Sequence, residues 1–158
     1  MRKFFYWFGA LAAALTLLLI VGFCYLFYTS SRLDRESKDY ADAASLAITS
    51  HWNPHELLSR ASPNLRSSMT IKQASSVFEW FGVLGTPIQS QDCKGSAMLF
   101  ASFGKPSSIT AQYVCSTNYQ QGAATIDIAL VKMDERWMVS GFYVKSPALL
   151  ARKPMQQL

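Results

Sequence analysis

The sequence predicts an α+β domain behind an N-terminal transmembrane helix, and three observations support this prediction. The run Phe4–Tyr28 contains no charged residue. From about residue 40 to residue 83, apolar residues recur at the three-to-four spacing of amphipathic helices. After about residue 88 the spacing changes to the alternation of half-buried strands. Helices followed by strands are typical of a sheet with helices gathered on one of its faces.

The apolar run is long enough to cross a bilayer as a helix. About 25 residues at 1.5 Å each span roughly 37 Å, and a hydrocarbon core is about 30 Å thick. Aromatic residues lie near both ends, Tyr6 and Trp7 early and Tyr25 and Tyr28 late, as expected at two membrane–water interfaces. We therefore expect residues 1–28 to form a cytoplasmic stub and an anchor in the lipid bilayer.

A cleaved signal peptide is the main alternative, because Arg2 and Lys3 give the chain a basic start. The apolar part of such a peptide is usually about 7–15 residues long and ends at a small-residue cleavage site. Here the run is longer and ends in LFYTSS, which offers no such site. A lipoprotein signal centred on Cys24 is disfavoured by the bulky Phe23 before it. The sequence favours an uncleaved anchor.

The net charge of +5 is spread along the chain without a run of Lys or Arg. Nucleic-acid binding needs a clustered basic face, so no nucleic-acid partner is expected. About 120 residues remain after the anchor and its link, which suits a single domain.

Cys93 and Cys115 are the two cysteines outside the anchor, and we expect them to form a disulfide. A bridge that closes a loop of about 22 residues stabilises the fold by roughly 3 kcal/mol in the chain-entropy model. Such bridges persist outside the cytoplasm, whereas the alternative is two free thiols in a cytosolic domain. Because basic residues flank both sides of the anchor, charge alone leaves the topology open, and the cysteine pair favours an exported domain.

Three helices are expected between the anchor and the first strand. Asn53 and Thr70 have the residue types that cap helices, and Gln73 completes a capping box with Thr70. The predicted helices are at about Leu33–Trp52, from Pro54 onward, and at about Ile71–Val83.

Short turns separate the strand-like segments, which predicts an antiparallel sheet of four to five strands. The domain is expected at residues 39–146, after a stalk at residues 29–38 and before a flexible tail at residues 147–158. The predicted strands are Ile88–Cys93, Ser96–Phe103, Ile109–Ser116, Thr125–Met133 and Trp137–Val144.

Four short motifs lie along the last helix and the strands: Phe81-x-x-Leu84-Gly85, Thr110-Ala111-x-Tyr113, Ile128-x-Leu130-x-Lys132 and Trp137-x-Val139-x-Gly141-Phe142. Together they resemble small bacterial exported domains of unknown function in the cystatin-like, or nuclear-transport-factor-two-like, superfamily. The resemblance covers roughly Asp39–Ser146. It implies helices packed on a curved sheet that forms a cone, and a location in the bacterial envelope. It implies no chemistry, since this superfamily holds enzymes, binding modules and scaffolds.

Candidate chemical residues are few. His51 and His55 have the spacing of two metal ligands on a helix, but Pro54 between them breaks that helix, so no metal site is predicted. Enzymes of the cone fold that resemble ketosteroid isomerase place a carboxylate in an apolar cavity. Asp127 and Asp92 are the candidates for such a carboxylate.

Asp127 alternates with apolar neighbours and is expected to face solvent. Tyr113 and Trp80 complete a speculative pocket with it, although core packing is the simpler interpretation of both aromatic residues. No catalytic residue and no cofactor is predicted.

Three functions follow as hypotheses. The first is a single-pass protein of the bacterial inner membrane whose non-enzymatic domain, in the periplasm or outside, binds a protein partner or a small apolar ligand. The second is a scaffold subunit of an envelope secretion or assembly machine, similar in plan to inner-membrane subunits of type IV secretion systems. The third is an isomerase- or dehydratase-like enzyme that uses Asp127.

Overall fold

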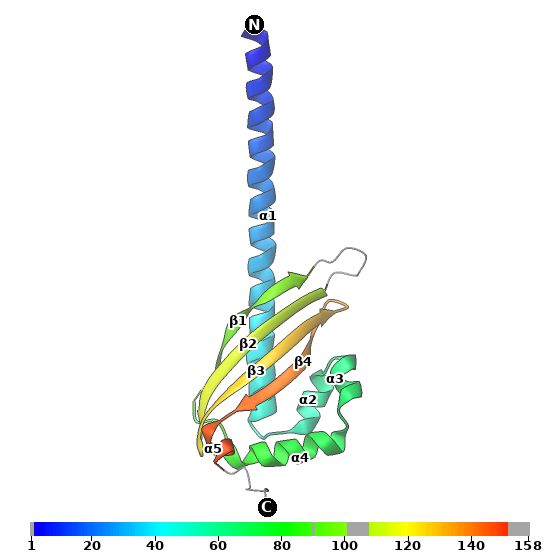
Figure 1. Ribbon diagram of the computed structural model, residues 1–158, viewed down its shortest axis with the longest axis vertical. Coiled ribbons are helices and arrows are strands. Elements are labelled where there is room, and N and C mark those ends of the chain that lie inside the picture. Colours follow the sequence, from blue (N-terminus) through cyan, green and yellow to red (C-terminus); the bar gives the residue numbers. More distant parts are fainter. Residues whose placement is uncertain (1, 90, 101–107, 152–158) are drawn as a thin grey trace, which may run out of the picture. The chain divides into compact units, whose positions relative to one another are not determined.

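The computed structural model describes residues 2–89, 91–100 and 108–151. The chain divides into two compact units, Met1–Arg35 and Glu36–Leu158. Helix α1 (Arg2–Thr49) begins in the first unit and ends in the second (Figure 1).

The first unit consists of the N-terminal part of α1. In the part of the chain that the structure describes, α1 is long and apolar enough to cross a membrane, and none of its most apolar window is buried. Exposed side chains there include Leu18 and Phe23. Residues 29–38, expected as a stalk, continue the same helix. The prediction of an N-terminal apolar helix is therefore confirmed, and a separate link after it is not seen.

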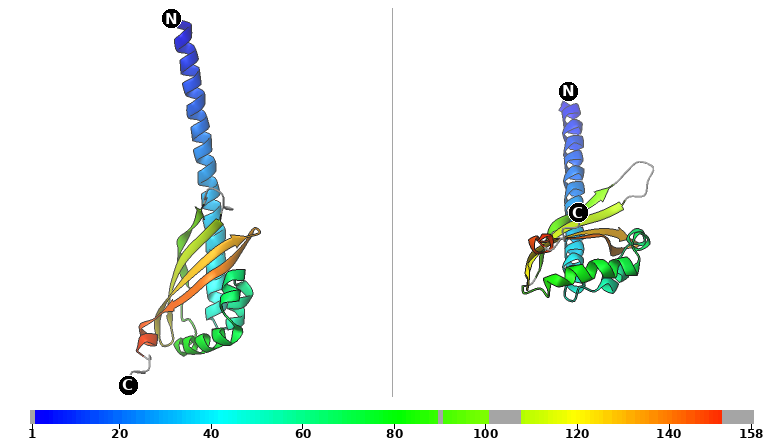
Figure 2. Two further views of the ribbon diagram at one scale, coloured as in Figure 1. Left: turned by 45° about the vertical axis from the view of Figure 1, so that its right-hand side comes forward. Right: turned by 60° about the horizontal axis from the view of Figure 1, so that its bottom comes forward.

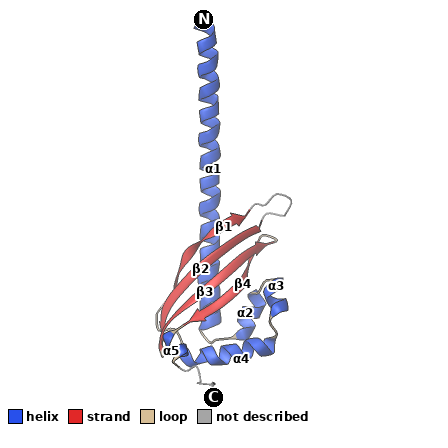
Figure 3. Cartoon of the chain, viewed as in Figure 1, coloured by secondary structure: helices blue, strands red, loops and turns tan. Residues whose placement is uncertain are grey.

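The second unit contains one antiparallel sheet in the order β1-β2-β3-β4 (Figure 3). Its strands are β1 (Asp92–Phe100), β2 (Ser108–Tyr119), β3 (Gly122–Met133) and β4 (Arg136–Lys145). The predicted antiparallel meander is confirmed, with four strands.

The prediction of two short strands around Cys93 and Ser96 is wrong, because β1 runs through both. Gly95 allows this continuity. A Cβ atom at this position would lie 1.9 Å from the carbonyl oxygen of Gln112 in β2, so a larger residue would push the two strands apart. Residues 101–103 of the expected second strand lie outside the described residues.

Four short helical segments follow α1, and a fifth follows the sheet. They are α2 (Pro54–Arg60), α3 (Pro63–Ser68), α4 (Ile71–Phe81), the 3₁₀ turn η1 (Gly82–Leu84) and α5 (Pro147–Leu150). The side chain of Asn53 caps α2, and Thr70 forms a capping box with Gln73 at α4, so both predicted helix starts are confirmed. The expected flexible tail instead begins with α5, because Leu149 is buried there. Residues 152–158 lie outside the description.

Helix α1 ends at Thr49, three residues before the expected boundary at Trp52. Trp52 has a φ of 47°, a left-handed conformation that is unfavourable for a bulky residue. This turn directs the indole into the core, where its Nε1 donates a hydrogen bond to the Gly85 carbonyl at 2.8 Å. Its ring centroid lies 5.6 Å from that of Phe81 and 5.3 Å from that of Tyr119. These contacts offset the backbone strain and stop the helix.

The core lies between the inner face of the sheet and the helices of the second unit (Figure 2). From α1, one face of small and branched residues is fully buried, with Ala41, Ala44 and Ile48 at its centre. The sheet contributes the alternate residues of its strands, and α4 contributes Phe78, which stacks on Phe142 of β4. The fully buried inner-face residues of β2, β3 and β4 include Ala111, Tyr113, Ile126, Ile128, Leu130 and Val139. The inner face of the sheet is therefore buried in the core.

Candidate functional site

The three residues of the speculative pocket do not come together. Tyr113 lies on the inner face of the sheet, where its hydroxyl and that of Ser37 form a 2.8 Å hydrogen bond. Asp127 lies on the other face and forms an ion pair with Lys145. Trp80 lies on α4 and is 42% exposed. Asp127 is therefore not the carboxylate of an apolar cavity, which the isomerase-like hypothesis requires.

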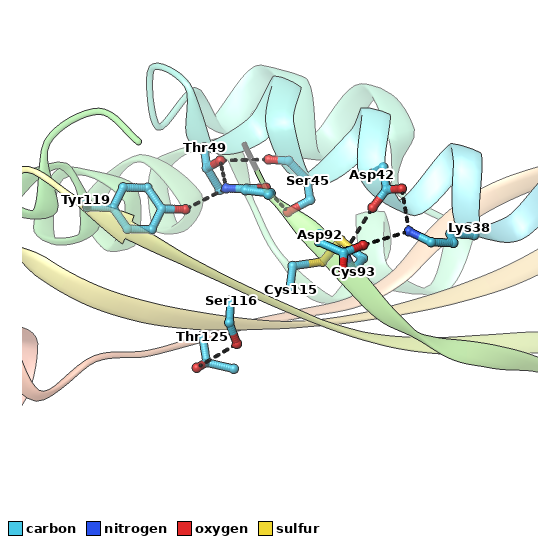
Figure 4. Close-up of a disulfide and its surroundings, with 11 residues drawn as sticks. Lys38, Asp42, Ser45, Thr49, Asp92, Cys93, Cys115, Ser116, Tyr119 and Thr125 are labelled. Atoms are coloured by element: carbon cyan, nitrogen blue, oxygen red, sulfur yellow. Dashed lines mark hydrogen bonds and ion pairs between the residues drawn. A yellow bond between two sulfur atoms is a disulfide. The ribbon is translucent and has the colours of Figure 1, made fainter. Parts of the chain in front are cut away.

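Cys93 and Cys115 pair directly across β1 and β2 and form a disulfide (Figure 4). Both are fully buried. On the α1 side, Asp42 accepts a hydrogen bond from the Cys93 amide at 3.1 Å, and Lys38 bridges Asp42 and Asp92 at 2.8 and 3.1 Å. These contacts fasten the edge strand β1 to α1, which gives Asp92 a structural role.

A polar cluster joins α1 to the sheet near the disulfide (Figure 4). Ser45 donates to the side-chain oxygen of Gln91 at 2.6 Å, and the Gln91 amide donates to Thr49 and to the Tyr119 hydroxyl at 2.7 and 2.8 Å. Burial raises the pKa of Tyr119, and its bonds to Thr49 and Gln91 only partly offset this. Because every member has a partner, the cluster fixes helix to sheet.

The two histidines lie on either side of the α2 N-cap, and both are exposed. Among the described residues, no group of three or more His, Cys, Asp or Glu side chains is placed to hold a metal ion. The backbone amide of His55 donates to the cap residue Asn53 at 3.0 Å. His55 thus contributes to a helix start through its backbone.

A surface pocket of about 360 Å³ lies where α1, α2, α3 and β4 meet. The junction between α2 and α3 is held against the edge strand β4, since Ala61 bridges Val139 and the Ser62 amide donates to the Val139 carbonyl at 2.8 Å. This attachment brings residues about 75 positions apart in the sequence to one site. The pocket is lined by Tyr40, Ser59, Arg60, Ala61, Pro63, Arg66, Arg136, Trp137 and Met138.

Three arginines line this pocket, and no Asp or Glu does. Arg66 donates to carbonyls at the end of α2, with the Leu58 oxygen at 3.1 Å. Arg60 forms an ion pair with Glu56 at 3.3 Å. Arg136 is exposed at the start of β4, where its backbone pairs with Met133. Within the part of the chain that the structure describes, its guanidinium has no hydrogen-bond or ion-pair partner. The three arginines and Glu56, the ion-pair partner of Arg60, together carry a formal charge of +2.

The rest of the lining combines apolar surface with polar donors. Trp137 is 9% exposed, and its Nε1 is buried without a hydrogen-bond partner among the described residues. The Lys132 ammonium lies over the Trp137 ring, 5.9 Å from the ring centroid. Burial raises the pKa of the Tyr40 hydroxyl, and the Arg60 guanidinium beside it partly opposes this rise. Tyr40 therefore stays protonated at neutral pH and can donate a hydrogen bond.

Comparison of the chain with protein-family models, curated proteins and solved structures finds no match. The resemblance to cystatin-like domains therefore remains a prediction. The arginine pocket was missed from the sequence. Its only sequence signal is Arg60 and Arg66 on either side of Pro63, and nothing in the sequence links that pair to Arg136.

Proposed function

We propose that this protein is a single-span membrane protein whose second unit binds a protein partner outside the cytoplasm and carries out no chemical step. The observation that carries this proposal is the occupied inner face of the sheet. In a cone domain that binds a ligand internally, this face would line a cavity. Here it is covered, because Tyr113 of β2 and Ile128 of β3 are buried, as is Ile48 of α1. Recognition is then a property of the outer surface, and the arginine pocket is a structured site on it.

Two further features support the location in this proposal. Helix α1 contains the apolar segment that a membrane anchor requires, and the Cys93–Cys115 disulfide suits an oxidising compartment. A bacterial inner membrane with the domain in the periplasm is the arrangement that fits both and agrees with the resemblance. A scaffold subunit of an envelope machine would use the same surface, and the identity of the partner distinguishes the two functions.

Photocrosslinking of the full-length chain in cells tests the proposal. A photoreactive amino acid at Met138, at the pocket, should give a discrete adduct of higher mass. The same substitution at Lys94, an exposed residue on β1, is the matched control and should give none. Failure of Met138 and of other pocket positions to form an adduct, in a chain that is folded and membrane-bound, would refute partner binding at this surface.

A second variant separates this proposal from the enzyme hypothesis. Asp127→Asn removes the only carboxylate of the speculative pocket but leaves the arginine pocket unchanged. The adduct should persist, and cells that carry the variant should have the same phenotype as cells that carry the parent chain. Loss of the phenotype with the adduct retained would instead favour a chemical role for Asp127.

A further inference from the structure

The chemistry of the arginine pocket defines what it can bind. All three cations that line it are arginines, whose planar guanidinium groups donate paired hydrogen bonds to carboxylate and phosphate oxygens. They come from three separate elements, α2, α3 and β4, which the contact of Ala61 with Val139 holds together. A pair of charges on one helix would not produce this arrangement.

The arginines differ in their availability to a ligand. Arg66 is engaged with the carbonyls at the end of α2, which holds its guanidinium in place at the pocket. Arg60 uses its Nε for Glu56. The Arg136 guanidinium has no hydrogen-bond or ion-pair partner in the described chain, and the residue is exposed. The pocket thus combines two positioned guanidinium groups with one that is available to close over a ligand.

The apolar part of the lining indicates that the ligand is more than an inorganic ion. A volume of about 360 Å³ falls in the range of small-molecule sites, about 300–1,000 Å³, and exceeds what one carboxylate or phosphate fills. Ala61, Pro63, Met138 and the Trp137 ring provide apolar surface beside the arginines. The buried Trp137 Nε1 lacks an acceptor, which is rare in folded proteins.

We propose that this pocket binds a carboxylate or phosphate group that is attached to an apolar body. Arg60, Arg66 and Arg136 bind the oxyanion, and Trp137 and Met138 contact the apolar part. The inference refines the proposed function, because it names the chemistry recognised at the same pocket. Two sources have this chemistry: the carboxyl end of a protein chain with an apolar last residue, and a small phosphorylated molecule.

The test uses the purified full-length chain in detergent micelles, with its four tryptophans labelled with ¹⁵N. The indole signal of Trp137 is assigned from a Trp137→Phe variant. N-acetyl-L-phenylalanine represents a chain end, phenyl phosphate represents a phosphorylated molecule, and N-acetyl-L-phenylalanine amide is the neutral control. A saturable shift of the Trp137 signal is expected with at least one of the two anions, and the tighter one identifies the source. The amide should bind at least about tenfold more weakly, since it cannot form the charge-assisted hydrogen bonds that a carboxylate accepts from guanidinium groups.

Three variants connect this binding to the arginines. Arg136→Gln should raise the dissociation constant of the tighter-binding anion by about tenfold or more. Arg136→Lys keeps the charge but loses the planar guanidinium, so its dissociation constant should lie between those of the parent chain and Arg136→Gln. Lys94→Gln removes an exposed positive charge elsewhere and should leave binding unchanged. The other three indole signals report whether each variant is folded.

Any one of three results would overturn the inference: no saturable shift with either anion up to about 10 mM, equal binding of the amide, or unchanged binding in Arg136→Gln. Because no partner is present in this experiment, its failure leaves the crosslinking test of the proposed function intact. Conversely, anion binding without any adduct in cells would support the pocket and refute the protein partner.

Discussion

Removal of the disulfide gives the most quantitative prediction for the fold. In the variant Cys93→Ala/Cys115→Ala, the unfolded chain regains the freedom of a loop with a sequence separation of 22 residues. The chain-entropy model assigns about 3 kcal/mol to this loop. Both cysteines are fully buried, so the shortened side chains also leave a cavity, which adds to the cost. The free energy of unfolding should therefore fall by at least about 3 kcal/mol.

Urea unfolding of the full-length chain in detergent micelles, followed by tryptophan fluorescence, measures this difference. For a domain of this size, the melting temperature should also fall by on the order of 10 °C. Cys24→Ser is the matched control, because Cys24 is a free and exposed cysteine of α1 and should leave the unfolding midpoint unchanged.

A small effect would refute this reasoning. If the double variant unfolds within about 1 kcal/mol of the parent chain, the bridge does not restrict the unfolded chain as the model assumes. Equal effects of the double variant and Cys24→Ser would show that thiol chemistry, and not the bridge, changes the stability.

Three further changes test the packing and the ion pairs of the second unit. Gly95→Ala should destabilise the domain by about 1–3 kcal/mol or more, because its Cβ would meet the Gln112 carbonyl; an unchanged urea midpoint would show that β1 and β2 can separate freely. Ile48→Ala should cost about 2–5 kcal/mol in the same assay, since Ile48 is fully buried between α1 and the sheet, and a loss below about 1 kcal/mol would contradict that packing. Side-chain hydrogen bonds to Asp42 of α1 and Asp92 of β1 raise the pKa of Lys38 above 10.5. The stability that these bonds give to the folded state is complete below pH 10.5 and is lost as the pH rises through the folded-state pKa. In the parent chain, the urea midpoint should therefore decline as the pH rises through this pKa, and Lys38→Gln should reduce that decline. Lys94→Gln should leave the decline unchanged. Equal declines in the parent chain and in Lys38→Gln would show that the Lys38 ion pairs do not stabilise the domain.

The parts of the fold that the sequence predicted are those determined by local chemistry. The uncharged run Phe4–Tyr28 predicted a long apolar helix, and the cap residues Asn53 and Thr70 predicted two helix starts that the structure confirms. Alternation from Ile109 to Cys115 predicted a half-buried strand, and β2 shows this pattern.

The parts that were missed depend on contacts between distant residues. Trp52 ends α1 early because its indole binds Gly85 and packs on aromatic residues that come later in the chain. The strands predicted at Ile88–Cys93 and Ser96–Phe103 are joined in β1, and the role of Gly95 in this continuity is visible only beside Gln112.

The arginine pocket was missed for the same reason. Arg60 and Arg136 meet there because Ala61 bridges Val139 across the α2–β4 contact, and no local pattern reports such a contact. By contrast, the speculative pocket failed on strand geometry. Tyr113 lies opposite Ile128 on the adjacent strand. Since successive side chains of a strand point to opposite faces of the sheet, Asp127 points away from the face that Tyr113 occupies.

The central claim is that an uncleaved apolar helix holds a disulfide-bonded domain in an oxidising compartment. The most direct test is the intact mass of the chain isolated from cell membranes after alkylation, with and without prior reduction. The account predicts a chain of 17.6 kDa that carries one alkyl group without reduction, at Cys24, and three after it. A chain that begins near Ser30, or three alkyl groups without reduction, would contradict the anchor or the bridge and with it the proposed location.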